Sequence, residues 1–167
     1  DRSDQLLDII STQAEGMAGA VLRFRGLLRG EQTRRQVMRE GRAPQIIGRS
    51  AALLQPVVEA LLSLREGDAG AAAGKLAEAA AQTPPVTGMY DGTQSFDAFQ
   101  DIDDVCAPLV EFITEGGDYQ WVPVGDIALL EVQPLQRARD LIWRPSRLEV
   151  RDGPAGEVYL PALYVPD

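Results

Sequence analysis

The stretch EGGDYQWVPVGDIALLEVQP, residues 115–134, contains one of the two tryptophans of the 167-residue chain. It opens with the turn-forming run EGGD, and Gly125-Asp126 forms a second turn signal between YQWVPV and IALLEVQ. Short runs of aromatic and branched residues bounded by turn formers are typical of β-strands. The stretch therefore predicts two strands of a small sheet, with Trp121 on the first of them.

Similar short runs of apolar residues bounded by turn formers occur on both sides of this stretch. PLVEFIT precedes it, LQRARDLIW after it predicts one or two helical turns, and SRLEVRD and EVYLPALYV flank GPAG as a predicted hairpin. These short strands predict a small, strongly curved antiparallel sheet. Pro123 and Pro161 cannot donate to a β-ladder, so we expect them at strand ends, edges or bulges.

Residues 1–83 predict helices instead. DRSDQLLDIIS, residues 1–11, is expected to form a short helix with Ser3 as its N-cap, and a longer helix is expected to end near Gly41. The clearest helix has apolar residues every four positions from residue 53 to residue 62. Pro56 either kinks this helix or marks its beginning.

A Gly-Asp turn follows this helix and leads into the alanine-rich segment AGAAAGKLAEAAAQ, which stops at Pro84. This order of helix, turn, alanine-rich helix and proline is similar to a tetratricopeptide (TPR) unit, although an ordinary helical hairpin has the same pattern. The expected fold is α+β: a TPR-like helical domain over 1–85, a connector over 86–106 and a small β-rich domain over 107–167.

The composition excludes several kinds of site. The chain has no histidine and one cysteine, so it cannot build a Ser-His-Asp or Cys-His site or a multi-cysteine zinc site. No phosphate-binding glycine loop and no membrane-length apolar run is present. We therefore expect a non-enzymatic protein without cofactor or metal, located in the cytoplasm, with Cys106 as a small buried apolar residue.

The run DIDD places Asp101, Asp103 and Asp104 together. A calcium-binding EF-hand loop that began at Asp101 would need glycine where Cys106 stands and glutamate where Phe112 stands. Three interpretations remain: carboxylates that cap turns, an acidic patch that binds a partner, or a metal or acid–base site. We favour the first and keep partner binding as the functional alternative.

The net charge of −9 is unevenly distributed. Residues 1–83 hold 11 basic and 10 acidic groups, a net charge of +1, whereas residues 84–167 hold 5 and 15, a net charge of −10. The acidic half would repel nucleic acid and anionic membranes. In the arginine-rich stretch, Arg34, Arg35 and Arg39 either form a solvated helical face or contact an acidic partner.

The two tryptophans occur in matching Trp-x-Pro motifs, Trp121 with Pro123 and Trp143 with Pro145. Tyr119 lies two residues before Trp121, so both side chains point to one face of a strand. Large rings of this kind anchor a small core or form a binding surface, and we favour the core. The prolines are expected to end or bend their strands.

Four blocks, taken in order, resemble the ImpE/TagJ (SciE-type) family of accessory proteins of bacterial type VI secretion systems. The blocks are LLSLREGDAGAAAGKLAEAA, DGTQSFDAFQDIDDVCAPLVEF, YQWVPVGDIALLEV and RDLIWRPSRLEV. Ala98 stands where the family usually has tryptophan. Residues 1–11 are similar to the second helix of a preceding repeat, so the chain is expected to be truncated at its N-terminus relative to the family.

The resemblance implies a non-enzymatic cytoplasmic adaptor that binds the small subunit of the contractile sheath and links the sheath to its ClpV-type unfoldase. With the charge of the acidic half, no nucleic-acid or membrane partner is expected, and the resemblance makes the two Trp-x-Pro motifs a structural signature of the family. Two alternatives stay open: a helical-repeat scaffold with another partner, and a metal-dependent enzyme that uses the three clustered aspartates.

Overall fold

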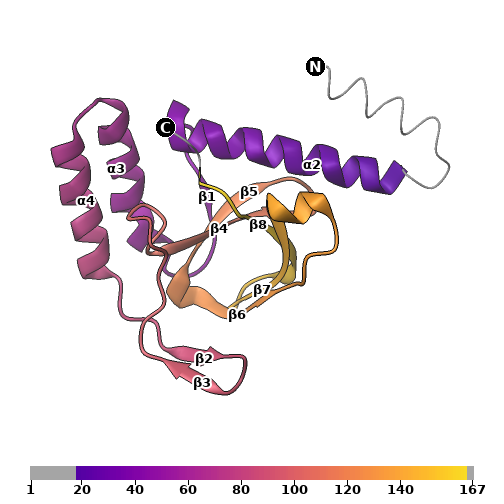
Figure 1. Cartoon of the computed structure of the whole chain (residues 1–167). Helices are drawn as coiled ribbons and strands as arrows, with labels where there is room; N and C mark the ends of the chain where they lie inside the picture. Colours follow the sequence, from indigo (N-terminus) through magenta and orange to yellow (C-terminus); the bar gives the residue numbers. More distant parts are fainter. Residues whose placement is uncertain (1–17, 165–167) are drawn as a thin grey trace.

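A computed structural model describes residues 18–164, which form an α+β fold of helices packed beside a six-stranded sheet (Figure 1). The helix expected over residues 1–11, with Ser3 as its cap, lies outside the described residues. Within the described part of the chain, no helix is long and apolar enough to cross a membrane.

Three α-helices are described, and short helical turns accompany them. The α-helices are α2 (Ala18–Arg35), α3 (Gln55–Arg65) and α4 (Ala69–Gln82); the turns are Gln36–Glu40, Ala51–Leu54, Val124–Asp126 and Ala138–Leu141. The π-helical turn after α2 ends at Gly41, whose φ of 85° is the left-handed conformation in which glycine commonly ends helices. The predicted end of the long helix is therefore confirmed.

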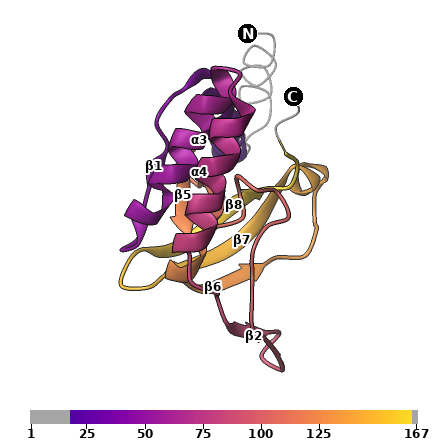
Figure 2. The same ribbon diagram turned by 90° about the vertical axis from the view of Figure 1, so that its left-hand side faces the viewer.

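Helices α3 and α4 form the expected hairpin and lie side by side (Figure 2). Pro56 lies in the first turn of α3, where no intrahelical donor is needed, so it marks the start of the helix rather than a kink. Asp68 caps α4 by accepting a hydrogen bond of 2.8 Å from the amide of Ala71. A single hairpin does not establish the TPR-like character expected from the sequence.

Eight strands are described, including all five expected from the sequence. They are β1 (Gln45–Ile46), β2 (Gly88–Tyr90), β3 (Gln94–Phe96), β4 (Leu109–Thr114), β5 (Tyr119–Pro123), β6 (Ile127–Val132), β7 (Trp143–Val150) and β8 (Ala155–Pro161). The main sheet has the order β1-β5-β4-β8-β7-β6, and β2 and β3 form a separate hairpin that projects from the body (Figures 1 and 2). The sheet is open at β1 and β6, so the strong curvature expected for it is not confirmed.

The ladder between β4 and β8 is short for a reason that lies in the sequence. The two strands pair only at Ile113–Tyr159 and Thr114–Val158. Peptide groups alternate in direction along a strand, so Glu111 and Ile113 direct theirs towards β8. The same register would next place Glu111 opposite Pro161, which has no amide hydrogen to donate. The strands separate beyond this point.

The main core joins the helices to the sheet. Its buried residues are Leu27, Val37, Leu54, Val57, Leu61, Ala79, Leu109, Ile113, Tyr119, Trp121, Trp143 and Tyr159. A second cluster packs Phe112, Val122, Leu148, Val150 and Val158 together. Strand β1, which lies within the 1–85 region expected to form the helical domain, also pairs in parallel with β5. The division into domains at 1–85, 86–106 and 107–167 stays a prediction, and the main core crosses these boundaries.

Helix α2 approaches the sheet closely through its glycines. A Cβ atom at Gly30 would lie 2.5 Å from Cγ2 of Ile113 on β4. At the turn between β4 and β5, Gly117 has a φ of 86°, and a Cβ atom there would lie 2.5 Å from the carbonyl oxygen of Gly26. The backbone of α2 therefore lies directly against the β4–β5 turn, and a side chain at Gly30 or Gly117 would push the helix away from the sheet.

Candidate functional site

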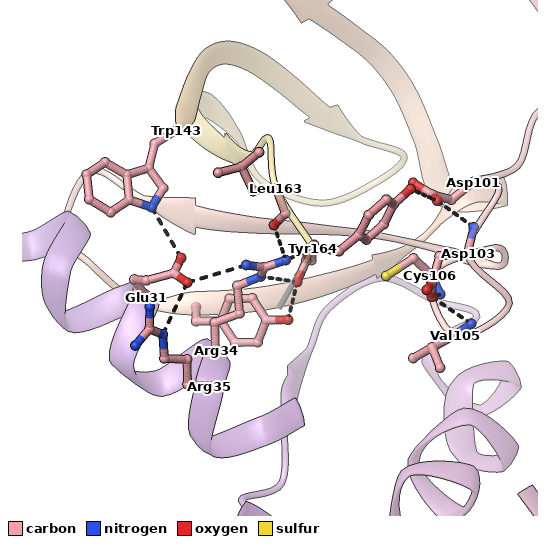
Figure 3. A network of polar contacts seen from close by, with 12 residues as sticks. Glu31, Arg34, Arg35, Asp101, Asp103, Val105, Cys106, Trp143, Leu163 and Tyr164 are labelled. Carbon is pink, nitrogen blue, oxygen red and sulfur yellow. Dashed lines mark hydrogen bonds and ion pairs between the residues drawn. The ribbon is translucent and has the colours of Figure 1, made fainter. Parts of the chain in front are cut away.

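The most extensive polar contacts in the described chain centre on Arg34, near the end of α2 (Figure 3). Only 3% of this residue is exposed. Its Nε and Nη2 donate to the two carboxylate oxygens of Glu111 on β4, at 2.8 and 2.7 Å, and Nη2 also donates to the carbonyl oxygen of Leu163 at 2.8 Å. This two-pronged contact ties α2, β4 and the segment after β8 together.

Both tryptophans donate into the same network. The hydroxyl of Tyr119 donates to Glu111 at 2.5 Å, and Nε1 of Trp121 donates to that hydroxyl oxygen at 2.6 Å. On the other side, Glu31 accepts from Arg34 at 3.4 Å and from Nε1 of Trp143 at 3.3 Å. The buried indole N–H groups are therefore satisfied by one connected set of charges.

The Trp-x-Pro motifs belong to the interior and not to a surface. Trp121 is fully buried and Trp143 is 5% exposed, and the Phe24 ring of α2 packs edge-on against Trp143 with centroids 5.9 Å apart. Pro123 ends β5, as expected. Pro145 lies inside β7 instead of at its end, and its carbonyl oxygen accepts from Gln133 just beyond β6.

The electrostatics of the network suit a fixed structural role. Burial opposes the charge of Arg34, but the hydrogen bonds and charge of Glu111 outweigh it and hold the pKa of the guanidinium above its ordinary value. Burial, and then the charge of Glu111, raise the pKa of the Tyr119 hydroxyl. Neither group changes its protonation near neutral pH, so neither is suited to general acid–base chemistry there.

The structure separates the three arginines that the sequence groups as partner-binding candidates. Arg34 is buried and bound to Glu111, so its guanidinium is not available to another protein. The side chain of Arg35 is 65% exposed and lies 3.8 Å from Glu31. Arg39 is also exposed. Of these three arginines, Arg35 and Arg39 are therefore the two that an acidic partner could reach.

The clustered aspartates organise the turn before β4. Asp101 accepts from the amide of Asp103 at 2.8 Å, and Asp103 accepts from the amides of Val105 and Cys106 at 3.0 and 3.1 Å. Asp104 is exposed. Among residues 18–164, no group of three or more carboxylate, cysteine or histidine side chains is arranged to hold a metal ion. Asp101 and Asp103 thus cap this turn, as the favoured interpretation expects.

The thiol of Cys106 is buried beside this turn. Burial, and then the charges of Glu111 and Asp103, raise the pKa of the thiol. A thiol that stays protonated at neutral pH is a poor nucleophile and a poor metal ligand. Cys106 therefore packs as the small apolar residue that the sequence predicts.

A cleft of about 300 Å³ opens where β4 and β8 separate. We call it the β4–β8 cleft, and its lining includes Phe99, Asp101, Val110, Leu130, Leu160 and Tyr164. The hydroxyl of Tyr164 donates to Asp101 across its rim, and this hydrogen bond raises the pKa of the hydroxyl to about 12. The cleft was not predicted from the sequence, although Pro161 is a signal that strand pairing stops there.

Comparison with known proteins gives consistent matches. Residues 93–166 match the family described as "ImpE protein". A curated relative from Pseudomonas aeruginosa (strain PAO1), named "Type VI secretion system accessory component TagJ", is 34% identical over 134 residues, which cover 80% of this chain and 47% of the relative. The chain thus spans about half the length of this relative.

A solved structure shares the fold. It is the crystal structure of protein VPA1032 from Vibrio parahaemolyticus, with a TM-score of 0.86 and 22% sequence identity. The similarity covers 96% of this chain and 60% of that one. At this level of identity, the likeness supports the arrangement of helices and strands and nothing about activity.

Proposed function

The chain belongs to the ImpE/TagJ family, and from this we propose that it is an accessory protein of a bacterial type VI secretion system that works by binding other proteins. The observation that carries the proposal is the 34% identity to a type VI accessory component over 80% of this chain. More specifically, it binds the small subunit of the contractile sheath in the cytoplasm and connects the sheath to a ClpV-type unfoldase.

The geometry agrees with a binding role. The most connected charged groups, Arg34 and Glu111, neutralise each other inside the fold, and the Cys106 thiol is buried. Exposed charge remains on Arg35, Arg39 and Asp104, which are the candidates for partner contact. An enzyme built on the clustered aspartates has no support from the geometry, because two of the three cap the turn before β4.

The test is binding of the full-length protein to the cognate small sheath subunit by isothermal titration calorimetry. Full length is required because the chain spans only about half of its curated relative. We expect saturable binding with a Kd of about tens of micromolar or tighter, the range of transient assemblies. Arg35→Glu combined with Arg39→Glu should weaken it, and Arg49→Glu, which reverses the charge of an exposed arginine paired with Asp152, is the charge-reversal control.

Absence of heat and of co-purification at these concentrations would overturn the sheath-binding proposal. Binding to another protein encoded beside the sheath genes would instead favour the alternative of a helical scaffold with a different partner. Equal loss of binding in the Arg35/Arg39 variant and the Arg49 control would show only a general effect of charge, and would remove these two arginines as the contact site.

A further inference from the structure

We propose that the β4–β8 cleft is a docking site for an extended, basic segment of a partner protein that carries an apolar side chain between its charges. The proposal rests on the chemistry of the cleft and does not depend on the sheath subunit being the partner. Three observations support it: an unfilled position in the sheet, a group of exposed apolar side chains and a one-sided distribution of charge.

The first observation is the open edge of β4. From Leu109 to Phe112 this strand has β5 on one side, whereas β8 has already separated from it on the other. The peptide group of Glu111 faces this opening, and Pro161 cannot donate to it. Addition of an extended segment to an exposed strand edge is a recurrent mode of peptide recognition. The opening therefore favours an extended occupant.

The second observation is the apolar surface around the opening. Phe99 is 47% exposed, Ile102 93%, Leu163 62% and Tyr164 50%. Phe99, Leu163 and Tyr164 line the cleft together with Leu130 and Leu160, and Ile102 follows the lining residue Asp101. Contiguous exposed apolar side chains around a hollow mark interaction sites, unlike single scattered ones. This surface suits an apolar anchor of the incoming segment.

The third observation is charge, and it selects the occupant. No lysine or arginine occurs between Lys75 and Arg137, whereas this stretch contains eleven acidic residues. Asp101 lines the cleft, and Asp103 and Asp104 follow it in the turn before β4. Arg34 reaches the neighbouring strand, but it is neutralised by Glu111. A rim of one sign attracts segments that carry lysine or arginine and repels acidic ones and nucleic acid.

The test uses the 167-residue chain and a fluorescein-labelled probe peptide of sequence Lys-Arg-Leu-Ile-Lys-Arg, followed by fluorescence anisotropy. Two control peptides replace Leu-Ile by Ser-Ser, or every basic residue by glutamate. We expect the probe to bind about tenfold more tightly than either control, since it alone combines charge with an anchor. Binding should weaken as NaCl is raised from about 50 to about 300 mM, because salt screens rim charges.

Matched variants locate the site. Phe99→Ser combined with Ile102→Ser removes two exposed anchors and should weaken probe binding about tenfold without loss of fold. Leu129→Ser, which removes a 40% exposed side chain from the opposite face of β6, should leave binding unchanged. Hydrogen exchange of the Glu111 amide should slow in the presence of the probe, because an added strand would cover the β4 edge.

Several outcomes would overturn the proposal. These are no binding of the probe at about 1 mM, equal binding of the acidic control, or equal loss of binding in the Leu129→Ser variant. Self-association that Phe99→Ser/Ile102→Ser abolishes would identify a second copy of the chain as the occupant instead. Failure of the full-length protein to bind the sheath subunit would leave this test untouched, because the probe measures the cleft directly.

Discussion

Arg34 is buried and holds parts of the fold together, whereas Arg35 and Arg39 nearby are exposed on the surface. Its guanidinium donates to two carboxylates, those of Glu111 and Glu31, and to the carbonyl oxygen of Leu163. A buried ion pair of this kind contributes little net stability compared with apolar residues of the same shape, but loss of one partner leaves an uncompensated buried charge. The cost of a single substitution is therefore large.

We expect Arg34→Met to lower the free energy of unfolding by about 3–5 kcal/mol, because Glu111 would be left buried without its cation. Urea denaturation followed by tryptophan fluorescence measures this. Arg35→Met is the control, since that arginine also approaches Glu31 but is 65% exposed, and its effect should stay within about 0.5 kcal/mol. Similar losses in the two variants would contradict the role given to Arg34.

The sequence could not have singled out Arg34 at this scale. It lies next to Arg35 in a run of similar residues, and its partner Glu111 is 77 positions away. Only the packing of α2 on β4 decides which arginine turns inward. The turn-capping role of Asp101 and Asp103 could be anticipated, by contrast, because their acceptors serve amides only two or three residues away.

At the scale of elements, the glycines in α2 and α4 differ in the space around them: Gly30 of α2 is crowded and Gly74 of α4 is open. Gly30 stands where a Cβ atom would press on the buried, branched Ile113, whereas a Cβ atom at Gly74 of α4 would meet nothing within 4 Å. Glycine inside a helix costs up to about 1 kcal/mol relative to alanine, so an open site gains from substitution and a crowded one does not.

Gly74→Ala should therefore stabilise the protein by about 0.5–1 kcal/mol through helix propensity and loss of unfolded-state freedom. Gly30→Ala should destabilise it, because an overpacking cost of about 1–3 kcal/mol exceeds the same propensity gain. Thermal denaturation followed by circular dichroism checks both variants. A stabilising Gly30→Ala would mean that α2 can move away from β4 at little cost.

Elements with a clear local pattern were predictable from the sequence. The α3–α4 hairpin has a four-residue apolar repeat and a capping aspartate, and the strands from β4 to β8 have turn formers on both sides. The strands β1, β2 and β3 were missed because two or three residues are too few to show a period. Their pairing partners, and not their own residues, make them strands.

For the whole molecule, the shared core predicts a single unfolding transition. Leu54 and Val57 from the helical segments pack in the same cluster as Ile113 and Trp121 from the sheet. Helices and sheet should therefore lose structure together, as small two-state domains do. Urea transitions followed by far-ultraviolet circular dichroism and by tryptophan fluorescence should share one midpoint. A helical signal lost before the tryptophan signal would instead support the division of domains predicted from the sequence.

The whole-molecule arrangement was the hardest to foresee. The fold class could be predicted because the sequence changes from helix-like to strand-like patterns after about residue 85. The docking of α2 on β4, in contrast, depends on contacts between positions more than 70 residues apart. The β4–β8 cleft arises in the same way, because Pro161 has its effect only in the register that places it opposite Glu111. Residues that act through a partner far away in the sequence produce no local periodic pattern from which their role could be predicted.

The contact between Gly26 and Gly117 has a consequence for inheritance. A Cβ atom at Gly117 would lie 2.5 Å from the carbonyl oxygen of Gly26, and Gly117 additionally needs its positive φ. A Cβ atom at Gly26 would make only ordinary contacts of 3.4–3.5 Å with the β4–β5 turn. A lineage could therefore accept a larger residue at Gly117 only after α2 had shifted, and such a shift would disturb Arg34 as well. The two codons are separated by 90 others, yet selection on residue 117 depends on the position of the helix that carries residue 26.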